Sequence, residues 1–268
     1  MQPASHPLSI RALSYIDDLG PCEEVQRLVW GFDDLEVVAA SHLSAAVHAG
    51  GLVAGAFYSE VNQDIFCGFV YGFPTHEKGS VGFHSHMMAV LPDYQGQGIG
   101  QRLKGFQRDW CLRRDLRYVT WTFDPLQAKN AKLNLEYLGA SASRYLVNPY
   151  GALGGNLNGA LPSDRLVAYW DLTHPRVADL EANPSLTPLD ATPQTYALHA
   201  DTLKLELSHE EPHLYIAAPE DINALRTADA NKALEWRLAQ REAFSHLFAR
   251  GYVATRFIDR YYVLTREE

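Results

Sequence analysis

The chain has 268 residues, of which 47% are apolar and 21% charged, enough material for one large domain or two smaller ones. Its net charge is −9, from 23 basic and 32 acidic side chains, whereas a protein that follows nucleic-acid phosphates usually carries a basic excess. We therefore expect no nucleic-acid partner. The sequence shows no run of about 20 apolar residues and no apolar segment near its start, which predicts no membrane span, no signal peptide and a cytoplasmic protein.

Apolar periodicity and turn residues predict alternating strands and helices up to residue 172, in the order β-α-α-β-β-β-α-β-α-β-β. The strands are expected at residues 8–14, 52–58, 66–72, 81–91, 117–123, 142–147 and 165–172. The helices are expected at residues 21–30, 35–49, 99–110 and 128–138. Polar turns are expected at residues 62–64 and 74–80, and a loop rich in Gly and Asn at residues 148–162.

Residues 175–194 contain four prolines and are expected to form a linker. A further strand (214–218), a helix (221–250) and a hairpin (252–258 and 261–265) follow. This β-α-β-β order repeats the second half of the first domain, so we expect either a degenerate half-copy or an unrelated α/β extension. The predicted domains are therefore residues 8–174 and 195–268.

Three cysteines, Cys22, Cys67 and Cys111, are odd in number and widely spaced. They show neither zinc-ligand spacing nor a disulfide pattern. We expect free thiols in the core, in a reducing compartment.

The most informative segment lies between the predicted strand 81–91 and the predicted helix 99–110. It reads Gln-Gly-Gln-Gly-Ile-Gly, with Gln95, Gly98 and Gly100 in the pattern Gln-x-x-Gly-x-Gly. Closely spaced glycines let backbone N–H groups approach a ligand, and a helix N-terminus favours phosphate. The segment lacks the Gly-Lys-Ser/Thr of a P-loop and the G-x-G-x-x-G of a dinucleotide fold.

Together with the element order, this pattern resembles the GNAT superfamily of acyl-CoA-dependent N-acyltransferases. The resemblance implies an α/β (α+β) fold around a mixed, splayed sheet, with acetyl-CoA or succinyl-CoA as co-substrate. It also implies that the turn binds the CoA pyrophosphate, through Gln95, Gly96, Gln97, Gly98, Ile99 and Gly100. The pantetheine arm would bond to backbone groups of Met88 and Val90, and Asn130 matches a helix asparagine that bonds the same arm.

His84 and His86 precede the turn on one strand, and alternation predicts that they share a face with Met88 and Val90. Imidazole suits proton transfer at neutral pH. The segment His-Ser-His-Met-Met-Ala-Val resembles that of the arylalkylamine N-acetyltransferases, whose paired histidines remove a proton through water. We therefore expect His84 as base and His86 as its partner, with a rate that rises through an apparent pKa near 6.5–7.

Other readings of these residues stay open. A strand histidine is more often structural, and His-x-His can hold a metal if a third ligand such as Asp124 joins it. Asp124, at the end of the next strand, is expected either to assist catalysis near the acceptor or to form an Asx turn before Pro125. We expect no bound metal.

The resemblance departs from the family at the general acid. Leu135 occupies the place where the family often has a tyrosine, so water or Tyr145 is left to protonate the thiolate. Arg144 and Arg165 are candidates for binding an acceptor carboxylate, with structural ion pairs as the alternative.

We thus expect a transferase that moves an acyl group from acyl-CoA to a small amine, with amino acids as one candidate class, in a direct ternary complex. A homodimer is one expected state. Two rival functions are a non-catalytic acyl-CoA sensor and a metal-dependent enzyme built on His84 and His86.

Overall fold

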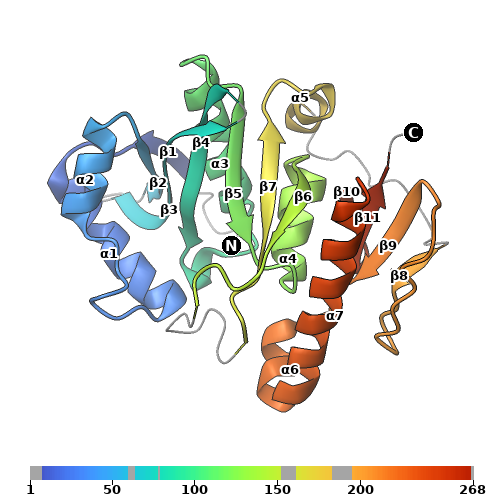
Figure 1. Cartoon of the computed structure of the whole chain (residues 1–268). Helices are drawn as coiled ribbons and strands as arrows, with labels where there is room; N and C mark the ends of the chain where they lie inside the picture. Colours follow the sequence, from blue (N-terminus) through green and yellow to red (C-terminus); the bar gives the residue numbers. More distant parts are fainter. Residues whose placement is uncertain (1–7, 60–63, 78, 152–160, 183–194, 267–268) are drawn as a thin grey trace, which may run out of the picture. The chain divides into compact units, whose positions relative to one another are not determined.

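The computed structural model describes residues 8–59, 64–77, 79–151, 161–182 and 195–266 (Figure 1). By their mutual contacts, the described residues form two compact units, one up to Val119 and the other from Thr120 onward. The described helices include none with the length and apolar character needed to cross a bilayer.

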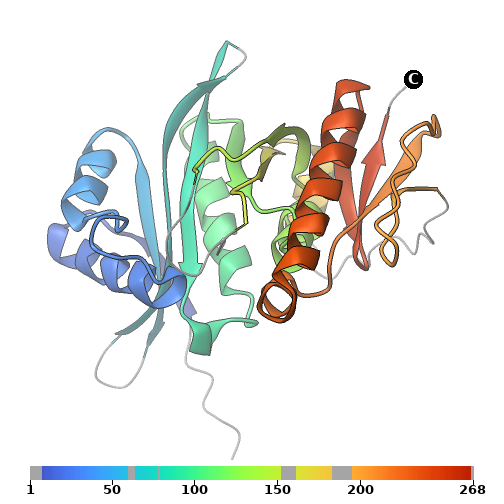
Figure 2. The same ribbon diagram turned by 60° about the horizontal axis from the view of Figure 1, so that its bottom comes forward.

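The first unit is a sheet with helices on both faces. Its elements are β1 (Leu8–Ala12), α1 (Ile16–Trp30), α2 (Ala40–His48), β2 (Leu52–Ser59), β3 (Asp64–Glu77), β4 (Ser80–Val90), η1 (Pro92–Tyr94) and α3 (Ile99–Leu112). Strands β1 to β4 pair in chain order, all antiparallel. Helices α1 and α2 cover one face of the sheet and α3 lies on the other (Figure 2). The core under α1 and α2 contains Leu19, Leu43, Phe69 and Tyr71.

Two predictions in this unit are wrong at their edges. Residues 35–39 are not helical, because the Asp33 carboxylate accepts hydrogen bonds from the N–H groups of Leu35 and Glu36 and so forms a turn before α2. Residues Pro74 to Glu77 continue β3 instead of forming a turn, with Pro74 opposite Phe83 of β4.

The second unit contains most of β5 (Tyr118–Phe123), which starts in the first unit. Its other elements are α4 (Ala128–Ala131), the π-helix η2 (Lys132–Tyr137), β6 (Ser141–Leu146), β7 (Arg165–Asp171), α5 (Pro175–Ala182), β8 (Tyr196–Leu198), β9 (His213–Ala217), α6 (Ile222–Ala228), α7 (Ala230–Ala249), β10 (Val253–Ile258) and β11 (Tyr261–Thr265). Its strand order is β5-β7-β6-β10-β11-β9-β8. The pairs β6–β7, β6–β10, β10–β11 and β11–β9 are antiparallel and β8–β9 is parallel, so the sheet is mixed.

The predicted helix 221–250 is two helices, because Asp229 leaves the helical conformation and caps α7 by accepting a hydrogen bond from Lys232 N–H. The first residues of the predicted linker form α5, which packs on Gly139: a Cβ at Gly139 would lie 3.0 Å from Leu180 Cδ1. The four prolines of residues 175–194 indicated a linker, and for this reason the helix was not predicted. Residues 62–63, 152–160 and 183–194 of the predicted turn, loop and linker lie outside the described residues.

The element order predicted up to residue 172 and the mixed α/β class are confirmed. The division between the compact units falls inside β5, not near residue 174, because β10 pairs with β6 and extends the sheet of the second unit. The predicted domain limits, 8–174 and 195–268, stay a prediction.

Candidate acyl-CoA and proton-transfer site

A β-bulge in β4 determines which side chains share a face with the two histidines. Gly72 of β3 pairs with Ser85, but Tyr71 pairs with Met87, so His86 is the extra residue of the bulge. Alternation restarts after it, and Met87 and Ala89, not Met88 and Val90, pack with Phe69 and Tyr71. The expectation that Met88 and Val90 share the histidine face is therefore wrong, since a bulge shifts a period of two by one residue.

His84 and His86 nevertheless lie close together, because the bulged residue turns toward the same side. Their ring centroids are 6.2 Å apart, and the Phe73 ring lies 5.5 Å from His84 and 5.6 Å from His86. His86 also meets Tyr71 edge-on at 5.7 Å. The two imidazoles of this strand thus pack against the aromatic rings of Phe73 and Tyr71.

A third histidine, which the sequence analysis missed, joins this group from α2. His42 Nε2 lies 3.2 Å from the Tyr71 hydroxyl, and the two rings meet edge-on. His42 is exposed, whereas Tyr71 is buried. No local pattern links residue 42 to residues 71 and 86, so only the packing of α2 on β3 could reveal this contact.

Both strand histidines favour the neutral form. Burial, followed by the nearby His86 and the ammonium of Lys104, lowers the pKa of His84 to about 4. His86 is more exposed than His84, but desolvation by its neighbours and then His42 also lower its pKa. At pH 7 the His84 imidazole is therefore neutral, as a general base must be, and its low pKa makes it a weak base.

Lys104 of α3 lies behind β4, almost completely buried. Its Nζ donates to Ser85 Oγ at 2.7 Å and to Gln107 Oε1 at 3.1 Å. Burial lowers the pKa of this amine to about 7. The opposite side of the histidine strand therefore carries a group whose charge changes near neutral pH.

The glycine turn leads from β4 into α3. Gly96 and Gly98 have φ of 77° and 76°, and a Cβ at either would meet nothing within 4 Å. Gly98 is the N-cap of α3 and provides no side-chain cap, so the first N–H groups of the helix have no capping side chain. Open space beside these donors is what an anionic ligand requires.

The two glutamines of the motif support the turn through their side chains. The Gln95 amide donates to Val90 O at 2.9 Å, and Gln97 Oε1 accepts from the Tyr58 hydroxyl at 2.8 Å. Tyr58 in turn stacks on Tyr94 with the ring centroids 5.6 Å apart. Ligand binding by Gln95 and Gln97, like that by Ile99 and Gly100, stays a prediction.

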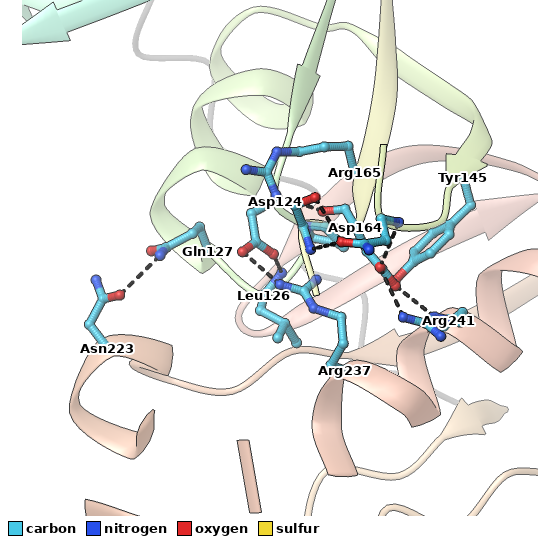
Figure 3. Close-up of polar contacts among 12 residues, drawn as sticks. Asp124, Leu126, Gln127, Tyr145, Asp164, Arg165, Asn223, Arg237 and Arg241 are labelled. Atoms are coloured by element: carbon cyan, nitrogen blue, oxygen red, sulfur yellow. Dashed lines mark hydrogen bonds and ion pairs between the residues drawn. The ribbon is translucent and has the colours of Figure 1, made fainter. Parts of the chain in front are cut away.

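Asp124, in the second unit, has strong structural partners (Figure 3). Its Oδ1 accepts from Leu126 N–H at 2.8 Å, the Asx turn considered above, and its Oδ2 pairs with Arg237 Nη2 at 2.8 Å. The Arg237 side chain is fully buried. Arg237 lies 113 residues from Asp124 in the sequence, so no local pattern could predict this ion pair.

The segment that replaces the family's general acid is a π-helix. Leu135 within η2 is buried, and its neighbour Glu136 accepts two 2.8 Å bonds from Arg256. The Tyr145 hydroxyl donates to Asp164 at 2.8 Å, and burial raises its pKa above the ordinary range. Tyr145 is thus a poor proton donor.

Asn130, the predicted CoA ligand, is exposed on α4.

The remaining candidates are two arginines, a metal site and the cysteines. Arg165 is buried and donates to the Asp164 carbonyl, while Arg144 is exposed.

In the part of the chain that the structure describes, no three His, Cys, Asp or Glu side chains gather to hold a metal ion. The three cysteines are free and buried, as predicted, and burial raises each thiol pKa to about 11 or 12.

The site geometry agrees with a comparison of the sequence with known families. Residues 54–133, which include β4, the glycine turn and α3, match the family model of the acetyltransferase (GNAT) domain. Residues 54–133 are therefore similar to the domain of the GNAT superfamily, the class of acyl-CoA-dependent N-acyltransferases. No curated protein matches the chain.

Solved structures with a similar fold are distant in sequence. The ribosomal-protein-S18-alanine N-acetyltransferase from Escherichia coli is 17% identical, with 63% of this chain and 96% of that chain covered and a TM-score of 0.49. A putative acetyltransferase from Salmonella typhimurium with its cofactor acetyl-CoA is 16% identical, with coverage of 63% and 96% and a TM-score of 0.48. Naa50 from Arabidopsis thaliana, in complex with a bisubstrate analogue, is 17% identical, with coverage of 60% and 97% and a TM-score of 0.47. At these scores the likenesses carry no argument about function.

Proposed function

We propose that this protein transfers an acetyl or succinyl group from acyl-CoA to the amino group of a small molecule, in a direct ternary complex. One observation carries the proposal: two imidazoles, both with lowered pKa values, lie on the strand that leads into an open, uncapped glycine turn. The turn is suited to the pyrophosphate, through backbone groups of residues 95–100. Backbone groups of Met88 and Val90, and the Asn130 side chain, are proposed to bond the pantetheine arm.

In this reaction the acceptor must first lose a proton, since amines are mostly protonated at neutral pH. His84 accepts that proton through a water molecule, and His86 is its partner. The amine nitrogen then bonds to the thioester carbon, the C–S bond breaks, and CoA leaves as a thiolate, while the new amide nitrogen releases its surplus proton to water. Water protonates the thiolate, because Leu135 cannot and the Tyr145 proton is held by Asp164.

The acceptor is proposed to be a small amine, with amino acids as one candidate class, and the protein to act in the cytoplasm. Three free thiols support a reducing compartment. A homodimer is a further proposal, which light scattering of the purified chain would test.

Turnover is the first test. Release of the CoA thiol would be followed with acetyl-CoA and with succinyl-CoA, against a panel of amines that includes amino acids. CoA binding without turnover of any amine would leave only the rival function of an acyl-CoA sensor.

The glycine turn offers a second test with a matched control. Gly98→Val adds a branched side chain in the space beside the helix N-terminus, and we expect CoA affinity to fall more than tenfold, about 1.4 kcal/mol. Gly79, in the β3–β4 turn, has φ of 78° and equally open surroundings, so Gly79→Val carries the same backbone strain away from the site. Equal CoA affinity of the two folded variants by calorimetry would refute the pyrophosphate assignment.

A further inference from the structure

The second unit contains two segments with the same element order. Residues 118–171 form β5, a helical segment, β6 and β7, and residues 213–265 form β9, a helical segment, β10 and β11. Across the sheet the strands of the first set lie in the order β5-β7-β6, and those of the second set follow in the order β10-β11-β9. Numbered within each set, these orders are 1-3-2 and 2-3-1, so one is the reverse of the other. A local two-fold axis between β6 and β10, where Ala142 pairs with Ala254, would produce this mirrored order.

The two central hairpins also agree in detail. Each shifts its register immediately after the paired alanine, Ala142 in β6 and Ala254 in β10. Each alanine follows by three residues a glycine with positive φ, Gly139 at 71° and Gly251 at 85°. Both segments read Gly-x-x-Ala-Ser/Thr-Arg-Tyr/Phe. A bulge and a left-handed glycine at matching places are not required by a hairpin as such, so they indicate a repeat.

The second segment contacts one short turn of the first. Arg237 of α7 pairs with Asp124, the Tyr262 hydroxyl of β11 donates to the Pro125 carbonyl at 2.8 Å, and the Gln127 amide donates to Asn223 of α6 at 3.2 Å. Figure 3 shows Arg237 and Asn223 reaching this turn from two helices. Three elements thus hold residues 124–127, directly before α4.

The ion pair between Arg237 and Asp124 has no counterpart among the described residues of the matching turn in the second segment. Ala218–Pro219 follow β9 as Asp124–Pro125 follow β5, so the second segment has an alanine where the first has the acid. The pairing arginine is fully buried, and its Nε and Nη1 have no hydrogen-bond partner among residues that the structure describes. Arg237 is also influenced by the nearby Tyr145 and Asp164, but Asp124 is its strongest partner. Burial of a paired guanidinium is a poor way to gain stability, but it fixes one geometry for the paired group.

We propose that residues 213–265 are an inverted second copy of residues 118–171, and that this copy serves as a positioning element for the turn at residues 124–127. Arg237 is its principal positioning residue. Asn130 lies one helical turn further on, so the position of the turn sets the position of a proposed CoA ligand. The catalytic consequence rests on the proposed acyl transfer, whereas the effect on CoA binding does not.

The test uses the full-length protein with the variants Asp124→Asn, Arg237→Met and the double mutant. The Asp124→Asn side chain keeps an oxygen for the Leu126 N–H but loses the charge that holds Arg237. We expect each single variant to raise the Kd for CoA and the KM for acyl-CoA about tenfold, with kcat changed less than threefold. The double mutant should be no worse than the worse single variant, because both remove one interaction.

Two further variants provide a substitute for Arg237→Met and a control. Tyr262→Phe removes one hydrogen bond to the same turn and serves if Arg237→Met does not fold, with an expected threefold rise in the Kd for CoA. Lys232→Met breaks an exposed ion pair with Glu235 on the same helix and should change nothing.

The outcomes separate the two proposals. Unchanged CoA affinity in folded Arg237→Met, or in Tyr262→Phe when the former does not fold, would overturn the positioning role. A hundredfold loss of kcat in Asp124→Asn at unchanged KM would also overturn it, because Asp124 would then be a catalytic residue. Wild-type protein that binds CoA but turns over no amine would defeat the proposed function alone, since the Kd comparison still stands.

Discussion

The ionisable groups around β4 and the buried Asp164 of the second unit favour opposite charge states. Around β4, burial is the largest influence on His84 and Lys104, and it moves their pKa values to about 4 and about 7, toward the neutral forms. In the second unit Asp164, also buried, accepts bonds from Tyr145, Asn148 and Arg241 that keep it charged. Groups that lose charge can take part in proton transfer, whereas paired charges fix a structure. This difference supports the proposal that proton transfer takes place at β4.

The largest effect is expected where a paired charge is removed. Asp164→Ala leaves the Tyr145 hydroxyl and the Arg241 guanidinium without their acceptor, so the free energy of unfolding should fall by about 3–5 kcal/mol. Urea denaturation would measure this. Glu235→Ala, which breaks an exposed pair on α7, should cost less than about 1 kcal/mol. Similar losses in the two variants would show that the buried cluster is not a structural anchor.

The pairing of Asp164 also has a pH signature. Burial alone would raise the pKa of this carboxyl, but the bonds from Arg241 and Tyr145 lower it below its ordinary value. A folded-state pKa below the unfolded one contributes stability that is complete above the unfolded pKa of about 3.9 and is lost as pH falls through the folded pKa. Wild-type protein should therefore lose stability below about pH 4 more steeply than Asp164→Ala, by thermal unfolding across that range.

At the half-buried His84 of β4, a substitution is expected to change the free energy of unfolding less than the loss of Asp164, but to change the reaction rate strongly. His84→Gln should reduce kcat about 10²–10³-fold, as expected for loss of a general base, with CoA affinity retained. His48→Gln, at an exposed histidine of α2, is the matched control. Near-normal kcat in His84→Gln, with chemistry limiting, would remove His84 from the mechanism.

The pH profile sharpens this prediction. The sequence suggests a rate that rises through pH 6.5–7, but a His84 pKa of about 4 keeps the base neutral down to about pH 5. We expect kcat to be flat from pH 8 to about 5 and to fall as His84 becomes protonated near pH 4. A step near pH 6.5 that persists in His84→Gln would assign the titration to another group.

A dependence of stability on pH above neutrality is expected from Lys104. Its folded pKa of about 7 lies below the unfolded value of about 10.4, so the unfolded chain binds more protons between these limits. Stability should then rise with pH in this window, with a slope of up to about 1.4 kcal/mol per pH unit from this group. Lys104→Met should abolish that slope. An unchanged slope would show that Lys104 stays charged in the folded protein.

The sequence predicted what depends on local signals. Glycine spacing located the turn before α3, and the order of elements up to residue 172 follows from apolar periodicity. The bulge at His86 was not predictable, because an extra residue in a strand leaves no mark on composition. The pairs His42–Tyr71 and Arg237–Asp124 join residues far apart in the chain, and only tertiary packing brings them together.

The three buried cysteines have a practical consequence for labelling. With thiol pKa values of about 11 or 12, the thiolate fraction at pH 7 is below about one in a thousand, so alkylating dyes should react slowly with Cys22, Cys67 and Cys111. A cysteine introduced at the exposed Lys129 of α4 would then be the main site of attachment. A fluorophore there would report movement of the 124–127 turn in an otherwise native background, without removal of any natural thiol.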